Sequence, residues 1–171
     1  MFGHSWSRVG VALVLAAGLA GCNGKPEDTG QSASSDATTL KTPAPSYPAW
    51  STGMIGKNLG EVSHGTIACK GQIDVVAAKY TGARPGSQIE GWAWNEKDAK
   101  PIDEVLLVDS SNRIVGAAVG GGSRTDVKAA LPEVKTAAVG WKGVAGITSG
   151  QVTAIGLTDR GASCVLSTMA L

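Results

Sequence analysis

The pattern of apolar and polar positions divides the 171-residue chain into four stretches. Residues 9–21 are uncharged and rich in Val, Leu and Ala, whereas residues 23–49 are polar and hold four of the seven prolines. Apolar side chains return over residues 50–65, where glycines interrupt any long helix. From residue 66 onward, short β-type runs alternate with turn residues. The pattern predicts a leader over 1–21, a disordered tether over 22–49, an irregular lead-in over 50–65 and one folded domain over 66–171.

The folded domain is predicted to be all-β, because its apolar runs are short and turn signals separate them. One short helix is expected over 123–131, with Thr125 as its N-cap and Pro132 blocking its extension. We expect an antiparallel β-sandwich of about seven strands, with a small β-barrel as the alternative. The expected strands are 72–78, 88–94, 104–109, 113–119, 138–147, 152–158 and 163–169.

The leader ends in the sequence Leu19-Ala20-Gly21-Cys22. The leader has the order of a secretory signal: first a cationic residue, Arg8, then an apolar run, then small residues. The run is also shorter than the roughly 20 residues that a transmembrane helix needs. Leu-Ala-Gly-Cys resembles the lipobox of bacterial lipoproteins. The resemblance implies cleavage before Cys22, acyl chains (palmitate among them) on that residue, and an envelope location. Asn23 in place of Asp implies the outer membrane, if the host has one.

The charge balance of the remaining chain excludes some partners. One of the 15 cationic residues, Arg8, lies in the leader, so 14 cationic and 14 acidic side chains remain. We therefore expect no nucleic-acid binding, which needs a basic patch. Membrane association has to come from the acyl chains.

Two cysteines remain once Cys22 is assigned to the lipid. Cys69 and Cys164 are expected to form a disulfide, because an exported protein meets an oxidising compartment. The alternative is two separately buried thiols. A bridge would close a loop of roughly 95 residues and contribute on the order of 4–5 kcal/mol to stability.

Four short motifs occur in a fixed order: Gly71-Gln72-Ile73-Asp74, Gly91-Trp92-Ala93, Arg124-Thr125-Asp126-Val127 and Gly140-Trp141. This order resembles a β-sandwich module attached to bacterial envelope and cell-wall proteins, over roughly residues 69–168. The resemblance implies the sandwich fold and a binding or spacing role. It implies no enzymatic activity.

The tryptophans are the candidate binding side chains. Trp92 and Trp94 lie two apart on one expected strand and should share a face. Ile89 points to that face only if Gly91 forms a bulge. We expect Trp92 in the core, with Trp141 packed against it. An exposed stacking platform at Trp94, beside a polar loop, is the alternative to burial, and Trp94 and Trp141 are the candidate glycan contacts.

Other candidate sites have structural explanations of their own. Arg124 and Asp126 could contact a ligand, but a structural turn accounts for them as well, with Arg124 pairing with a carboxylate or carbonyls and Asp126 capping backbone N–H groups. The sequence Gly120-Gly121-Gly122-Ser123-Arg124 lacks the lysine and the spacing of phosphate-binding loops.

Catalytic groups are sparse in the sequence. The mature chain has one histidine, His64, and no nucleophile-elbow motif. Metal ligands are lacking if the two cysteines pair. A carboxylate pair for glycoside hydrolysis would have to come from Asp98, Asp103, Glu104 or Asp109. We therefore expect a non-catalytic interaction or structural module without cofactor or metal, which meets an envelope protein or glycan. Glycan binding and, behind it, a carboxylate-based hydrolase are the alternatives.

Overall fold

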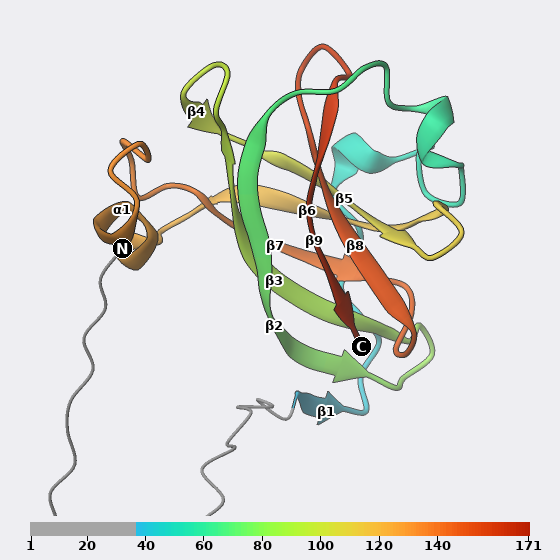
Figure 1. Cartoon of the computed structure of the whole chain (residues 1–171). Helices are drawn as coiled ribbons and strands as arrows, with labels where there is room; N and C mark the ends of the chain where they lie inside the picture. Colours follow the sequence, from blue (N-terminus) through green and yellow to red (C-terminus); the bar gives the residue numbers. More distant parts are fainter. Residues whose placement is uncertain (1–36) are drawn as a thin grey trace, which may run out of the picture. The chain divides into compact units, whose positions relative to one another are not determined.

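Strands are the main secondary structure of residues 37–171, the part of the chain that the computed structural model describes (Figure 1). The helices are short: the 3-10 helices η1 (Ala49–Ser51) and η2 (Leu59–Glu61), and α1 (Thr125–Ala130). The strands are β1 (Thr38–Leu40), β2 (Cys69–Tyr80), β3 (Gly86–Asn95), β4 (Lys100–Pro101), β5 (Glu104–Asp109), β6 (Ile114–Gly122), β7 (Gly140–Ala145), β8 (Gln151–Leu157) and β9 (Ser163–Ala170).

All nine strands belong to one sheet, with the order β1-β2-β3-β7-β6-β5-β8-β9 and β4 paired to β3. Every pairing is antiparallel except that of β1 with β2. The sheet curls so that β9, at one end of the order, packs against β2, near the other end. The fold is therefore all-β and consistent with the predicted sandwich. The sheet is not closed by strand pairing, so the small barrel is not formed.

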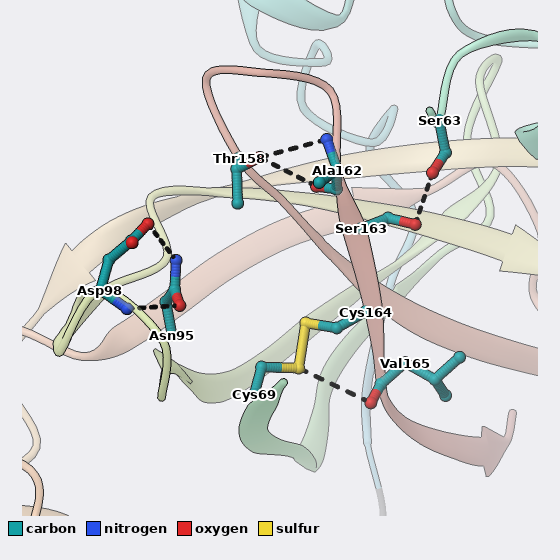
Figure 2. The surroundings of a disulfide bond; sticks show 9 residues. All are labelled: Ser63, Cys69, Asn95, Asp98, Thr158, Ala162, Ser163, Cys164 and Val165. Atoms are coloured by element: carbon teal, nitrogen blue, oxygen red, sulfur yellow. Dashed lines mark hydrogen bonds between the residues drawn. A yellow bond between two sulfur atoms is a disulfide. The ribbon is translucent and has the colours of Figure 1, made fainter. Parts of the chain in front are cut away.

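Side-chain contacts close the seam between β2 and β9. The Cys69–Cys164 disulfide joins the start of β2 to the start of β9, with 6.2 Å between the Cα atoms (Figure 2). Further along, the backbone N–H of Ile73 donates to Ser167 Oγ at 2.7 Å. The side chain of Leu166 lies so close to Gly71 that a Cβ there would be 2.8 Å from Leu166 Cδ2. Covalent and packing contacts thus replace the missing backbone ladder.

The core lies on the inner, concave face of the curled sheet, where alternate residues of most strands meet. Three segments cover parts of the outer face. Residues 50–62 lie over β5, β6 and β8, α1 and residues 131–139 lie over β3, and residues 44–47 lie beside β2 and β7. The inner cluster includes Ile73, Ile89, Val105, Leu107, Trp141 and Val152.

The structure corrects the predicted extent of the tether. Residues 38–49 were expected to be disordered, yet β1 pairs with β2 and Ala44 is only 2 % exposed. Arg84 donates from Nε to the Ala44 carbonyl at 3.0 Å, and Ala44 N–H donates to the Arg84 carbonyl at 2.7 Å. The polar composition of this segment indicated disorder. The contacts that order it come from residues far along the chain, so its composition does not reveal them. The predicted leader and Cys22 lie outside the described residues.

Two predicted details of the elements are wrong. Arg124, and not Thr125, is the N-cap of α1, and its side chain makes no capping hydrogen bond. The bulge expected at Gly91 lies on the partner strand, where the register shifts between Ile73 and Val75, so that Asp74 is the extra residue. The two strands beyond the expected seven are β1, in the predicted tether, and β4, in the polar loop after β3. Within residues 37–171, no helix combines the length and apolar character needed to span a bilayer.

The seam yields a stability prediction. Replacing both Cys69 and Cys164 by Ser should lower the free energy of unfolding by on the order of 4–5 kcal/mol, because the bridge constrains an unfolded loop of roughly 95 residues. Denaturant titration of the wild-type and double-Ser chains measures the difference. An Ile73→Ala variant, which thins the seam packing but keeps the bridge, is the control. Unchanged midpoints in the double-Ser chain would contradict the role given to the bridge.

Candidate functional site

The tryptophans of β3 lie on the outer face of the sheet, not in the inner core. Without a bulge on β3, Ile89 and Ala93 point inward, while Trp92 and Trp94 point to the opposite face. There they are covered by α1 and residues 131–139, which leaves Trp92 8 % and Trp94 2 % exposed. The alternative prediction of an exposed stacking platform at Trp94 is therefore wrong. This burial depends on where α1 and residues 131–139 pack, which local sequence patterns do not show.

Trp141 lies apart from the other two indoles, in the inner core. It pairs with Gly91 across β7 and β3 and is 2 % exposed. A Cβ at Gly91 would overlap the indole ring, so this glycine provides the space in which Trp141 lies. Its indole N–H is buried without a hydrogen-bond acceptor in the described chain. Neither candidate tryptophan thus presents an aromatic surface to a ligand.

Arg124 is held in place by two carboxylates. Its Nε and Nη2 donate to Asp126 at 2.9 and 2.7 Å, and its Nη1 donates to Asp74. The stem of Arg124 crosses Gly140, where a Cβ would lie 3.0 Å from Arg124 Cγ. The bulge on β2 brings Asp74 to this face. Arg124 therefore links the start of α1 to β2. Its pairing with carboxylates agrees with the structural alternative to a ligand-binding role.

These ion pairs shift the pKa values of both partners. The hydrogen bonds to Asp126, followed by those to Asp74, raise the pKa of Arg124 above its ordinary value. The hydrogen bonds from Arg124 lower the pKa of Asp126 to about 2. Arg124 is thus a fully engaged cation that forms one wall of a depression in the sheet.

This depression, which we name the outer groove, is a hollow of about 510 Å³ over β2, β3, β7 and β6. Four glycines, at positions 91, 120, 122 and 140, contribute to its lining without side chains. Glu90 and Lys142 lie opposite each other on β3 and β7 and form an ion pair of 2.8 Å. Val119, which is 49 % exposed, lies beside Lys142 on β6. The remaining lining residues are Asp74, Val75, Ser123, Arg124 and Trp141.

The carboxylates considered for glycoside hydrolysis have separate structural roles. Asp98 makes two hydrogen bonds of 3.0 Å with the buried Asn95 (Figure 2). Asp109 accepts from the backbone N–H groups of Ser111 and Arg113 in the β5–β6 turn. Neither is placed to act with the other as an acid–base pair.

Asp103 and Glu104 do share a small hollow of about 180 Å³ with Asp159. Burial, with smaller contributions from Asp159 and Asp103, raises the pKa of Glu104, while Lys100 lowers that of Asp159. Among residues 37–171, no three His, Cys, Asp or Glu side chains are placed to hold a metal ion.

A second cation anchors the cover of Trp92 and Trp94. Lys70 on β2 pairs with Glu133 at 2.6 Å and with Glu96 at 3.2 Å. The hydrogen bonds that Lys70 donates to Glu133 and Glu96 raise the pKa of Lys70, and the bond to Glu133 lowers the pKa of that carboxyl. Arg124 and Lys70 therefore hold the segment over the β3 indoles at two places, the start of α1 and Glu133.

The Arg124–Asp126 pair predicts a loss of stability in acid. A native pKa of about 2 lies below the ordinary value of 3.8, so the pair stabilises the fold above pH ~4 and this contribution is lost as the pH falls toward 2. We expect Asp126→Asn to be less stable than wild type at pH 6, with the difference shrinking between pH 4 and 2. Thermal unfolding across this range measures it, with Asp98→Asn as the control. A difference that stayed constant with pH would contradict the assignment.

Comparison of the chain with models of known protein families, with curated proteins and with solved structures found no match. The resemblances to the lipobox and to envelope β-sandwich modules stay expectations from the sequence. The function has to be argued from the outer groove and from the chemistry of the residues around it.

Proposed function

We propose that this chain is a lipid-anchored envelope protein whose β-sandwich domain binds a partner non-catalytically through the outer groove. The leader and the sequence Leu19–Cys22 support the anchor, and Asn23 favours the outer membrane if the host has one. The Cys69–Cys164 bridge supports an oxidising location, because such bridges persist outside the reducing cytosol.

The single observation that carries the binding role is the incomplete cover of the outer sheet face. Three segments of the chain itself cover the apolar parts of that face over β5, β6 and β8, over β3, and beside β2 and β7. The outer groove stays open between them, with the exposed Val119 on its border and charged side chains on its walls. An open, mixed apolar and charged hollow on an otherwise covered face is typical of a contact surface.

The alternatives have less support. Glycan stacking on Trp94 or Trp141 would need exposed indoles, and both are buried. A carboxylate-based hydrolase would have to use Asp103, Glu104 and Asp159, but Asp159 is already paired with Lys100 at 3.3 Å. Their shared hollow is about a third of the volume of the outer groove.

The anchor is tested by replacing Cys22. In a Cys22→Ala chain we expect the protein to leave the membrane fraction and the detergent phase, because the acyl chains supply its affinity for lipid. Phase partitioning with a nonionic detergent measures this. An unchanged partition of Cys22→Ala would contradict lipidation.

The groove is tested with a matched pair of variants in the full detergent-solubilised chain. Val119→Glu places a charge at the border of the outer groove, whereas Val165→Glu makes the same change at an exposed valine on β9. We expect fragments of peptidoglycan to perturb the backbone amide resonances of the groove glycines. Val119→Glu should weaken this binding about ten-fold or more, as for a central contact residue, and Val165→Glu should not. Equal effects of the two substitutions would remove the groove from the binding surface.

A further inference from the structure

The Glu90 carboxylate in the outer groove is fixed on one side and open on the other. Tyr80 donates its hydroxyl to Gln88 Oε1 at 2.9 Å, and Gln88 Nε2 donates to Glu90 Oε1 at 3.0 Å. Lys142 Nζ also lies at Oε1, 2.8 Å away. The described residues give Oε2 no hydrogen-bond partner. Glu90 is thus an acceptor pre-positioned by two side chains, with one oxygen left to receive a donor.

The cation that Glu90 now holds is replaceable. The Lys142 side chain is 63 % exposed, and an exposed ion pair of this kind contributes little to stability. Arg124, by contrast, is bound by Asp74 and Asp126 together. Of the two cations in the groove, Lys142 is the one that a ligand can displace.

The charge around the groove favours a cationic ligand. Asp74, Asp126 and Glu90 carry three negative charges, whereas Arg124 and Lys142 carry two positive ones. If Lys142 swings away, the region near Glu90 becomes more negative still. Val119 and Val75 border the hollow and offer apolar surface to the methylene stem of a long side chain.

The glycines of the groove point to a peptide and not to a free amine. Gly122 and Gly140 pair across β6 and β7 and bring no side chain to the lining. The stem of Arg124 lies over Gly140, so the position that a second backbone can approach closely is Gly122. The outer groove has a volume of about 510 Å³, which falls in the range of ligand pockets and is larger than one ammonium group requires.

We propose that the outer groove binds an extended peptide bearing a lysine-type side chain, whose ammonium takes the place of Lys142 at Glu90. This inference rests on the proposed function, because it names the ligand class of the same groove. Lys142 then acts as a built-in competitor: it keeps Glu90 paired when the groove is empty and moves aside when the ligand ammonium arrives.

If Lys142 competes with the ligand, removing Lys142 should strengthen binding. Other binding modes do not predict this increase in affinity. The probe is acetyl-Gly-Lys-Gly-amide, titrated into the full detergent-solubilised chain while the amide resonances of the groove glycines are followed. Lys142→Gln should tighten binding about two- to five-fold, because the competing exposed ion pair is gone. Glu90→Gln should weaken it about ten-fold, because the charged acceptor is lost. Lys57→Gln, which changes the net charge equally at an exposed site of the lead-in, should leave binding unchanged.

Other probes separate the competing outcomes. Peptides with glutamate or norleucine in place of lysine should not shift the glycine resonances. Binding of the glutamate peptide, weakened by Lys142→Gln, would show an anion site and overturn the inference. Equal binding of the norleucine peptide would show a purely apolar contact, and equal binding of cadaverine a site for free amines. Either result overturns the proposal of a peptide ligand.

The failure of this inference is distinguishable from failure of the proposed function. If peptidoglycan fragments perturb the groove glycines and the lysine peptide does not, the ligand class is wrong and the binding role stands. If neither probe perturbs them, both the ligand class and the groove as a binding surface fail.

Discussion

The closure between β2 and β9 is the constraint on which the rest of the structure depends. Strand pairing leaves the curled sheet open at this seam, and an open seam would give water access to the inner core. The Cys69–Cys164 bridge, the Ile73–Ser167 hydrogen bond and the packing of Leu166 on Gly71 close it. Because the core forms on the concave side only while the sheet stays curled, the curvature of its outer face, where the groove lies, depends on the same contacts.

Small residues decide where the large ones lie in this domain. Gly91 leaves room for Trp141, and Gly140 lets Arg124 lie flat across β7 toward Asp74. The result is a division of the indoles, with Trp141 in the inner core and Trp92 and Trp94 beneath α1 and residues 131–139. The outer groove lies between the three segments that cover the rest of the outer face.

The sequence predicted the class of the fold because alternation and turn residues are local signals. The hairpin of β5 and β6 follows from such signals, whereas the cysteine pair was predicted from the two cysteines that remain after Cys22. The Glu90–Lys142 pair does not follow from local signals, since it depends on the register of two strands about fifty residues apart. Residues 38–49 were predicted as disordered because their composition is polar, although β2 pairs with residues 38–40 and Arg84 binds the Ala44 carbonyl. The burial of Trp94 likewise depends on a cover that only the tertiary structure reveals.

The position of β9 in the chain has a consequence for the order of folding. β9 is the last of the nine strands in sequence order, and its partner across the seam, β2, begins about 95 residues earlier. The contact that completes the domain is therefore among the most non-local in the chain, and such contacts slow folding. β2 to β8 can pair as synthesis proceeds, but their concave face stays open until the last strand is made. The inner core is therefore completed by β9 and not by the strands that precede it in the sequence.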